Sequence, residues 1–364
     1  MPFWSGWFGR GGDTLNKGDQ KQKAPASDSE TPVTFDTAMS VSAFWASTRL
    51  LTEAVAGLPL KAFTINPENN IKEPNPNHEL WKLINYKPNR RQTRTEFFEQ
   101  IMLNLVVRGN SFVAIDRTSA GKIISLTPIP ADQVKVILME DGDVVYQYTT
   151  AGNHIRVFSE KSIWHVRLFG NGLIGLSPLQ YAAKALGISL DLEKRVSKLA
   201  KNGGKTTGIL TFDKELKKEQ REAFRQSYQG LVDGNQDELF VLEAGMAYHQ
   251  TSLNPADMEA LKNRRFALED VARFIGVPSV LINDTAGSTV WGSGIGQIME
   301  GFYKLNLRPY LERIESSLKR NLMPQSEWQS IEIEFDFSAL LRADTATRIE
   351  TSTKGINAGV YTPD

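Results

Sequence analysis

The sequence has no cysteine and only four histidines. Without cysteine the chain has no disulfides, no thiolate metal ligands and no cysteine nucleophile, which is compatible with assembly inside a cell. No histidine has a second histidine at the spacing of an H-E-x-x-H zinc site. We therefore predict no metal site and no cofactor. His165, in a predicted strand between Trp164 and Val166, is typical of a hydrogen-bonded core or edge histidine.

The chain also lacks an excess of either charge and any long apolar run. Lysine plus arginine and aspartate plus glutamate number 42 each. Proteins that hold DNA tightly without regard to sequence are normally basic, because neutralising phosphates drives their binding, so static DNA binding is not expected. No apolar run approaches the roughly 18–20 residues of a membrane span. The aromatic stretch Met1 to Phe8 is too short for a signal-peptide core. We expect no membrane contact and assembly in the cytoplasm.

Recognisable catalytic motifs are missing as well. The run Gly203-Gly204-Lys205-Thr206 resembles part of a phosphate-binding loop, but Leu199 stands where that motif needs glycine. The run also follows a predicted helix rather than a strand, so we interpret it as a helix C-cap. No G-x-S-x-G nucleophile motif occurs. We predict that the chain is not an enzyme; a nucleotide-dependent enzyme that uses Gly204, Lys205 and Thr206 is kept as an alternative.

Residues 37–176 contain both helical and alternating apolar patterns. Apolar residues at helical spacing predict helices, and alternating patterns bounded by turn residues predict strands. This combination indicates an α+β fold with a strand meander. The predicted helices span 41–56, 78–84 and 95–107, and the predicted strands span 60–65, 111–116, 123–128, 134–139, 144–148 and 163–166. Between the predicted strands 134–139 and 144–148, Asp141-Gly142-Asp143 lacks the further ligands of a calcium loop and predicts a β-turn.

Two long helices surround a small insert in the middle of the chain. Ser177, Pro178 and Gln180 form a helix-start pattern, and the helix they begin is predicted to end at Gly203-Gly204. The second helix is predicted over residues 254–276. Between them, residues 205–253 predict a minimal β-α-β unit with strands at 208–212 and 238–242 and a helix at 217–231. This arrangement indicates a two-helix stalk that carries a small domain.

The remaining segments are an N-terminal arm and a helix-rich final part. Residues 1–36 are polar and aperiodic and predict a disordered arm with an aromatic tip. Residues 277–297 predict a glycine-rich mobile loop. A long helix over 298–322 contains Pro309, which should kink or divide it. A strand over 331–337 and a helix over 338–357 follow.

One charge pattern has two open interpretations. Lysines recur at i, i+4, i+7 and i+11 along the first long helix, and these are Lys194, Lys198, Lys201 and Lys205. The stripe is either a solvated face helped by the helix dipole or a surface that faces nucleic acid or an acidic partner. A monomeric nucleic-acid-binding module is therefore a second alternative.

Several short motifs, in a fixed order, resemble the portal proteins of tailed bacteriophages, closest to the lambdoid long-tailed type. The resemblance covers the chain from about Val41 onward. The motifs are Pro88-Asn89, Thr95-Glu96-Phe97, Arg108-Gly109-Asn110-Ser111-Phe112, Ile174-Gly175-Leu176-Ser177-Pro178-Leu179, Asp257-Met258-Glu259-Ala260-Leu261 and Phe274-Ile275-Gly276-Val277-Pro278. The family pattern continues beyond the Gly359 to Pro363 segment, where this sequence stops at Asp364, so only the start of its C-terminal crown region is expected.

The resemblance implies a portal-type fold. Residues 37–176 would form the α/β wing, 177–204 and 254–276 the two stem helices, 205–253 the clip and 277–297 the tunnel loop. Residues 298–337 would be the long kinked helix and a strand that returns to the wing, and 338–364 the start of the crown.

The resemblance also implies a function and partners. The chain would form a ring, expected to be a dodecamer, at one capsid vertex of the virion, and double-stranded DNA would be packaged and ejected through it without sequence readout. The other expected partners are the major capsid protein or a scaffold, the terminase large subunit and the head-tail adaptor protein. The expected channel contacts in the loop are Thr285, Ser288, Thr289, Val290, Trp291 and Ser293, with the four lysines of the stripe as further candidates.

Overall fold

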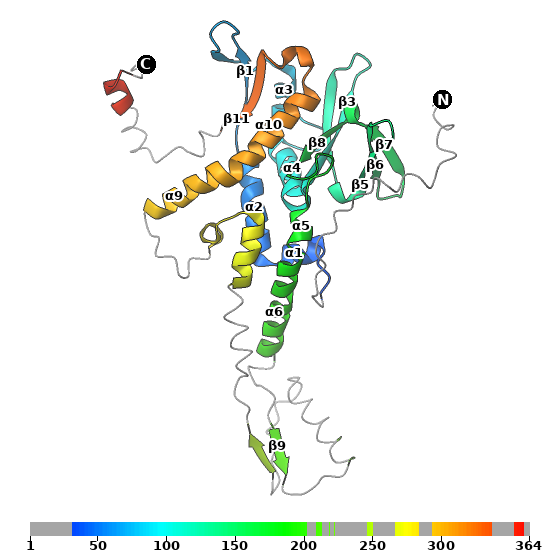
Figure 1. Ribbon diagram of the computed structural model, residues 1–364, viewed down its shortest axis with the longest axis vertical. Coiled ribbons are helices and arrows are strands. Elements are labelled where there is room, and N and C mark those ends of the chain that lie inside the picture. Colours follow the sequence, from blue (N-terminus) through cyan, green and yellow to red (C-terminus); the bar gives the residue numbers. More distant parts are fainter. Residues whose placement is uncertain are drawn as a thin grey trace. The chain divides into compact units, whose positions relative to one another are not determined.

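The computed structural model describes residues 31–201, 209–212, 218, 222, 246–249, 266–283, 293–336 and 353–359. The chain divides into two compact units. The first comprises Met1–Ala24, Trp45–Tyr181 and Ala272–Asp364, and the second comprises Pro25–Phe44 and Ala182–Val271. Each is described by itself below (Figure 1).

The first unit is built on three small sheets of three strands each. One sheet has the order β11-β1-β2, the second β4-β3-β8 and the third β5-β6-β7. All of their pairings are antiparallel. The strands are β1 Leu60–Ile65, β2 Lys72–Pro74, β3 Asn110–Arg117, β4 Ile123–Ile129, β5 Val134–Leu138, β6 Val144–Thr149, β7 Ile155–Ser159, β8 Ile163–Arg167 and β11 Ile331–Phe335. The α+β class is confirmed. Of the predicted meander strands, β5 and β6 form a meander with β7, which was not predicted, whereas β3, β4 and β8 form a separate sheet.

Several helices of this unit bury apolar residues and pack on its sheets. Helix α4 begins at a capping box, in which Thr93 and Glu96 bond to each other's backbone N–H, and it ends at Gly109 in the left-handed conformation. The helices and helical turns are α2 Ser42–Ala56, α3 Glu79–Tyr86, α4 Arg94–Arg108, η2 Ala131–Gln133, η3 Glu160–Ser162, α5 Pro178–Tyr181, η4 Ser279–Ile282, α9 Ser293–Gly301, the π-helical η5 Phe302–Leu307, α10 Arg308–Leu322 and η6 Gln325–Glu327. α2 begins in the second unit and continues into the first.

Aromatic side chains join α4 to two of the sheets. Phe97 and Phe98 are fully buried, and the ring of Phe98 meets Phe335 of β11 edge-on at 5.0 Å. The ring centroid of Phe97 lies 6.4 Å from that of Trp164 in β8. The indole N–H of Trp164 donates to Ser317 Oγ at 2.9 Å. The core of this unit therefore joins residues that are far apart in the sequence. Each aromatic side chain removes a large apolar area from water and makes oriented ring contacts.

The second unit contains α1 Phe35–Ser40, α6 Ala183–Lys201, and the antiparallel strands β9 Ile209–Phe212 and β10 Met246–His249. Thr31 Oγ1 donates to Asp191 Oδ1 of α6 at 3.3 Å. Residues 266–271 of a helix that continues to residue 275 also belong to it. These elements agree with a long helix entering and a helix leaving a small insert.

Several element predictions differ from the structure. The first long helix is divided at the buried Ala182 into α5 and α6. In the insert, the strand that pairs with β9 is β10, while the predicted strand 238–242 lies outside the described residues, as does most of the predicted helix 217–231. The polar edge strand β2 and the exposed strand β7 carry too weak an apolar pattern to be found from the sequence.

The structure also differs from the prediction over residues 277–322, which were expected to form a loop and then a long helix. Residues 293–297 were expected in the loop, but they are helical in α9. Glycine lowers helix propensity there, yet burial of Phe302 and Leu307 in the continuing helix compensates for it. The expected division of the helix is present as the π-helical η5, which ends directly before Arg308 and Pro309. Proline fits there because the first turn of α10 needs no N–H donor.

Candidate functional site: the segments that flank residues 284–292

The chain enters this region through a tight turn at Gly276. The helix over 266–275 ends there, and Gly276 has a φ of +80°, which suits glycine. The N–H groups of Gly276 and Val277 both donate to Ala272 O at 3.0 Å, so the last carbonyls of the helix are satisfied. Pro278 then precedes η4, which ends at Asn283 in a left-handed conformation. This turn fixes the direction in which the chain leaves the helix.

The turn packs against the π-helical segment on the other side of residues 284–292. A Cβ atom added to Gly276 would lie 3.1 Å from the Asn306 amide nitrogen of η5. Gly276 therefore lies close to Asn306 of η5, and we call this contact the Gly276 joint. π-Helical turns of this kind occur mainly as local insertions, frequently at functional sites.

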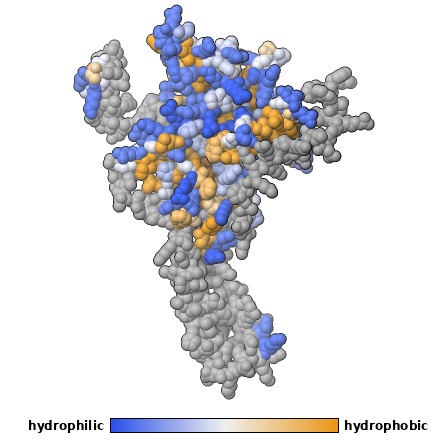
Figure 2. Space-filling view, viewed as in Figure 1, coloured by the Kyte–Doolittle hydropathy of each residue, from blue (hydrophilic) through white to orange (hydrophobic). Residues whose placement is uncertain are grey.

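The helices that follow the loop carry paired charges and exposed apolar groups. Glu300 pairs with Lys304 at 2.6 Å and Arg308 with Glu312 at 2.8 Å, both at i,i+4 spacing on exposed faces. Leu305 is 76% exposed and Met299 is also exposed. Figure 2 shows hydrophobic colour in the area of α9, among hydrophilic residues. Over residues 293–312 the charges therefore cancel, with two acidic residues against two basic ones.

The predicted channel residues are placed only in part. Ser293 is the first residue of α9, and Lys194 is an exposed residue of α6. Lys198 and Lys201 also belong to α6. Thr285, Ser288, Thr289, Val290, Trp291 and Lys205 lie outside the described residues, as does the Gly203 to Thr206 run. The predicted role of all these residues therefore stays a prediction.

Two of the sequence motifs form a tight backbone clasp instead of a ligand site. Asn110 Oδ1 accepts from Gly175 N at 2.8 Å, and its amide nitrogen donates to Gly175 O at 2.9 Å and to Arg108 O at 3.1 Å. Gly109 has a φ of +70°, and a Cβ there would lie 1.7 Å from Leu176 O. A Cβ on Gly175 would lie 2.1 Å from Gly109 O. Glycine at both positions is thus required by the close approach of two backbones.

His165 is buried beside this clasp and is neutral. Its Nε2 lies 3.0 Å from Asn110 Oδ1, which can only accept, so Nε2 carries the proton and donates. Nδ1 then accepts from the Tyr146 hydroxyl at 3.4 Å. Burial, with a smaller effect of the Arg167 charge, holds the pKa of His165 well below its usual value, and burial raises the pKa of Tyr146 to about 12. The expectation of a hydrogen-bonded core histidine is confirmed.

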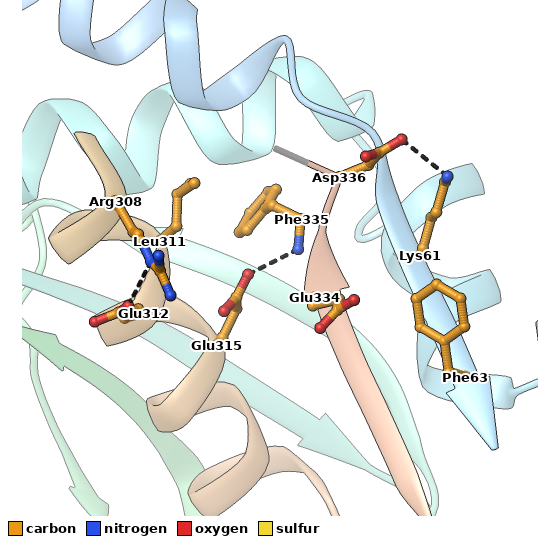
Figure 3. Close-up of a pocket in the computed structure, with 9 residues that line it drawn as sticks. All are labelled: Lys61, Phe63, Arg308, Leu311, Glu312, Glu315, Glu334, Phe335 and Asp336. Carbon is orange, nitrogen blue, oxygen red and sulfur yellow. Dashed lines mark hydrogen bonds and ion pairs between the residues drawn. The ribbon is translucent and has the colours of Figure 1, made fainter. Parts of the chain in front are cut away.

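An acid-rich pocket of about 370 Å³ lies between β1, β11 and α10 (Figure 3). Most of its charged groups already have partners: Lys61 pairs with Asp336 and Arg308 with Glu312, both at 2.8 Å. Glu315 accepts from Phe335 N at 2.7 Å. Burial raises the pKa of Glu315, and the neighbouring carboxylates add to this effect. Sequence reasoning did not find the pocket, because β11 joins β1 only in the tertiary structure.

The described part of the chain has neither a metal-binding cluster nor a membrane-spanning helix. Its histidines and carboxylates form no group of three or more that could hold a metal ion. None of its helices has both the length and the apolar character of a membrane span.

The predicted turn at Asp141-Gly142-Asp143 is present, with Gly142 N donating to Met139 O at 3.1 Å and Met139 N to Asp143 O at 2.8 Å.

Known proteins resemble this chain over most of its length. A family model described as phage portal protein matches residues 42–364. The portal protein of Enterobacteria phage HK97 is 33% identical, with 94% of this chain and 84% of that protein covered. The probable portal protein of Streptomyces phage phiC31 is 29% identical, with 100% of this chain and 84% of the relative covered.

Solved structures share the fold at lower identity. A crystal structure of an HK97-family phage portal protein from Corynebacterium diphtheriae superposes with a TM-score of 0.63 at 18% identity, covering 85% of this chain and 97% of the other. A chain in the neck of a native gene transfer agent particle, computed with C12 symmetry, gives 0.62 at 24% identity, covering 92% of each chain. The family model matches nearly nine-tenths of the sequence, and the HK97 portal protein is 33% identical over 94% of it. This chain therefore belongs to the phage portal protein family.

Proposed function

We propose that this protein forms the ring-shaped channel at one vertex of a tailed-phage capsid, through which genomic DNA is packaged and ejected. The observation that carries this proposal is the membership of residues 42–364 in the phage portal protein family. The fold shared with a chain from a particle neck of C12 symmetry supports a ring of twelve copies in the virion. A cyclic ring of identical chains needs two different, complementary surfaces on each subunit.

In this proposal the tunnel loop, residues 277–297, narrows the channel, and its contacts with passing DNA are made by Thr285, Ser288, Thr289, Val290, Trp291 and Ser293. The Gly276 joint would fix the chain at the start of this loop. Serine and threonine hydroxyls can touch the sugar–phosphate backbone without reading bases, and glycines allow the loop to change conformation. The paired charges of Glu300 and Lys304, and of Arg308 and Glu312, suit a surface over which a polyanion must slide.

The other parts of the chain take the remaining roles. Residues 177–204 and 254–276 would form the stem, with the lysine stripe of α6 as a further weak contact with DNA. The insert around β9 and β10 would be the clip, which would bind the terminase large subunit during packaging and the head-tail adaptor protein afterwards. The wing, residues 37–176, would contact the major capsid protein or a scaffold.

Two alternatives make different predictions. A monomeric nucleic-acid-binding module that uses the lysine stripe would bind duplex DNA as a monomer, with a strong dependence on salt. A nucleotide-dependent enzyme that uses Gly204, Lys205 and Thr206 would hydrolyse ATP and lose that activity in Lys205→Ala. Balanced charge argues against the first, and the helix that precedes the glycines argues against the second.

Native mass spectrometry combined with negative-stain imaging of the purified protein tests the proposal. We expect rings of about twelve copies with a central hole wide enough for duplex DNA, and no ATP turnover. A protein that stays monomeric at high concentration, also when prepared with any further C-terminal residues its gene encodes, would contradict the proposal. Salt-dependent DNA binding by such a monomer would favour the first alternative.

A further inference from the structure

A second surface of the first unit has the features of a peptide-binding groove. Helix α3, the tip of the β3–β4 hairpin and the segment after α10 enclose a volume of about 1120 Å³. Its apolar lining includes Leu83, Tyr86, Ile123, Ile124, Met323 and Pro324. Tyr86 is 73% exposed and Ile124 is 54% exposed, so two large apolar side chains face solvent beside the groove. We call this surface the α3 groove.

Tyr86 is exposed but held in a defined position. Its ring meets Trp81 edge-on, with 5.9 Å between centroids and an interplanar angle of 86°. Trp81 in turn donates its indole N–H to Leu60 O at 2.7 Å. A positioned aromatic ring that stays exposed is typical of a binding anchor, because little conformational entropy is lost when a partner covers it.

The charges around the α3 groove are unbalanced. Of its two carboxylates, Glu79 pairs with Lys122 at 2.6 Å, and Glu327 lies 3.2 Å from His78 Nε2, which is a charged partner only when protonated. The guanidinium of Arg117 donates to two backbone carbonyls, those of Gly121 and Asn321.

The lining holds four lysine or arginine side chains against two glutamates, so it carries a net positive charge. Within the described ranges no carboxylate forms an ion pair with Lys82, Lys87 or Arg117, all of which line the groove. An apolar groove with three such cations is electrostatically complementary to an acidic ligand.

We propose that the α3 groove binds an acidic amphipathic segment of another protein. Its apolar side chains would pack on Tyr86 and Ile124, and its carboxylates would face Lys82, Lys87 and Arg117. Such a helix-in-groove contact is a recurring mode of peptide recognition. The apolar lining favours a peptide over nucleic acid, since phosphates gain nothing from Leu83, Ile123 or Met323. This inference goes beyond the proposed channel and does not depend on ring formation.

A synthetic helical peptide with leucine on one face and glutamate on the other is the probe. Its fluorescein-labelled form is titrated with the full-length protein, and binding is followed by anisotropy. We expect Tyr86→Ser and Lys87→Glu each to weaken binding about tenfold, as for an interface anchor. The matched controls are Ile155→Ser, which removes an equally exposed apolar group of β7, and Lys161→Glu, which reverses an exposed charge in η3. Both controls should bind as the unchanged protein does.

Several results would overturn the proposal. These are failure of the unchanged protein to bind the probe, equal binding of a peptide with lysine in place of glutamate, and equal losses in the control variants. Duplex DNA that displaces the probe would assign the groove to nucleic acid. Ring formation is measured in parallel by native mass spectrometry. Loss of rings in the Tyr86→Ser variant would make the groove a subunit contact, whereas absence of rings in the unchanged protein would contradict only the proposed channel.

Discussion

At the residue scale, Gly109, Asn110, Gly175 and His165 act as one structural group. The carboxamide of Asn110 uses its donors and its acceptor on Gly175, Arg108 and His165. Because the partners come from α4, β8 and the segment before α5, the group fixes how three parts of the first unit meet. Residues that carry the family resemblance are here explained by packing, with no ligand required.

Gly109→Ala is expected to destabilise the protein strongly. The substitution adds left-handed strain of about 1–3 kcal/mol, and its Cβ would collide with the Leu176 carbonyl. Gly121→Ala is the matched control, because Gly121 has a similar φ of +84° but no atom within 4 Å of an added Cβ. Thermal unfolding of both variants separates strain from collision. Equal losses of melting temperature in the two variants would show that the close approach contributes nothing.

His165 should make the protein less stable in mild acid. Its pKa in the folded protein lies below the unfolded value of about 6.5, so below that pH the unfolded chain binds a proton that the folded chain refuses. The free energy of unfolding should therefore fall by up to about 1.4 kcal/mol per pH unit below pH 6.5, while above it this group has no effect.

Thermal unfolding from pH 7.5 to pH 5 measures this effect. His165→Gln keeps a donor for Asn110 but cannot titrate, and His154→Gln removes an exposed histidine as the control. A pH dependence that is unchanged in His165→Gln, relative to the control, would contradict the assignment.

At the scale of elements, the Gly276 joint brings the end of the helix over 266–275 against η5. Local signals predicted part of it: Gly276 and Pro278 mark a helix end from the sequence alone, and Pro309 indicates a division of the following helix. The π-helical turn and its contact with Gly276 through Asn306 required the tertiary structure.

Gly276→Ala should disturb this joint and impair packaging more than DNA affinity. It would strain a residue with a φ of +80° and push Asn306 aside, which we expect to cost about 1–3 kcal/mol. Gly301→Ala in α9 is the control: an added Cβ meets no atom within 4 Å, and alanine favours helix by about 1 kcal/mol over glycine. Packaged DNA per particle and melting temperature are the measurements. Normal packaging by Gly276→Ala particles would argue against a role for this joint.

At the scale of the whole molecule, balanced charge is the property with the clearest functional consequence. Lysine plus arginine equals aspartate plus glutamate over the full chain, at 42 each. A channel must let DNA pass, and every phosphate that is firmly neutralised by a cation would resist movement.

We therefore expect assembled rings to bind duplex DNA weakly and with a shallow dependence on salt. Between 50 and 200 mM salt, affinity should fall less than about tenfold, against the roughly thousandfold or greater loss of a protein with six or more phosphate contacts. Fluorescence anisotropy with labelled duplex measures this. A steep salt dependence that disappears in a Lys194→Ala, Lys198→Ala, Lys201→Ala variant would instead assign firm DNA contacts to the stripe of α6.

The sequence by itself determined the class of the fold and most of its elements, because the apolar periodicities and caps that define a helix or strand are local. Strand β1 and helices α2 and α4 were located within one or two residues, and the order of short motifs was enough to indicate the family. The tertiary structure alone decided the pairing of β1 with β11, the Asn110 clasp, the Gly276 joint and the α3 groove. Each of these joins residues distant in the chain, and a local pattern carries no information about which distant surface will cover it.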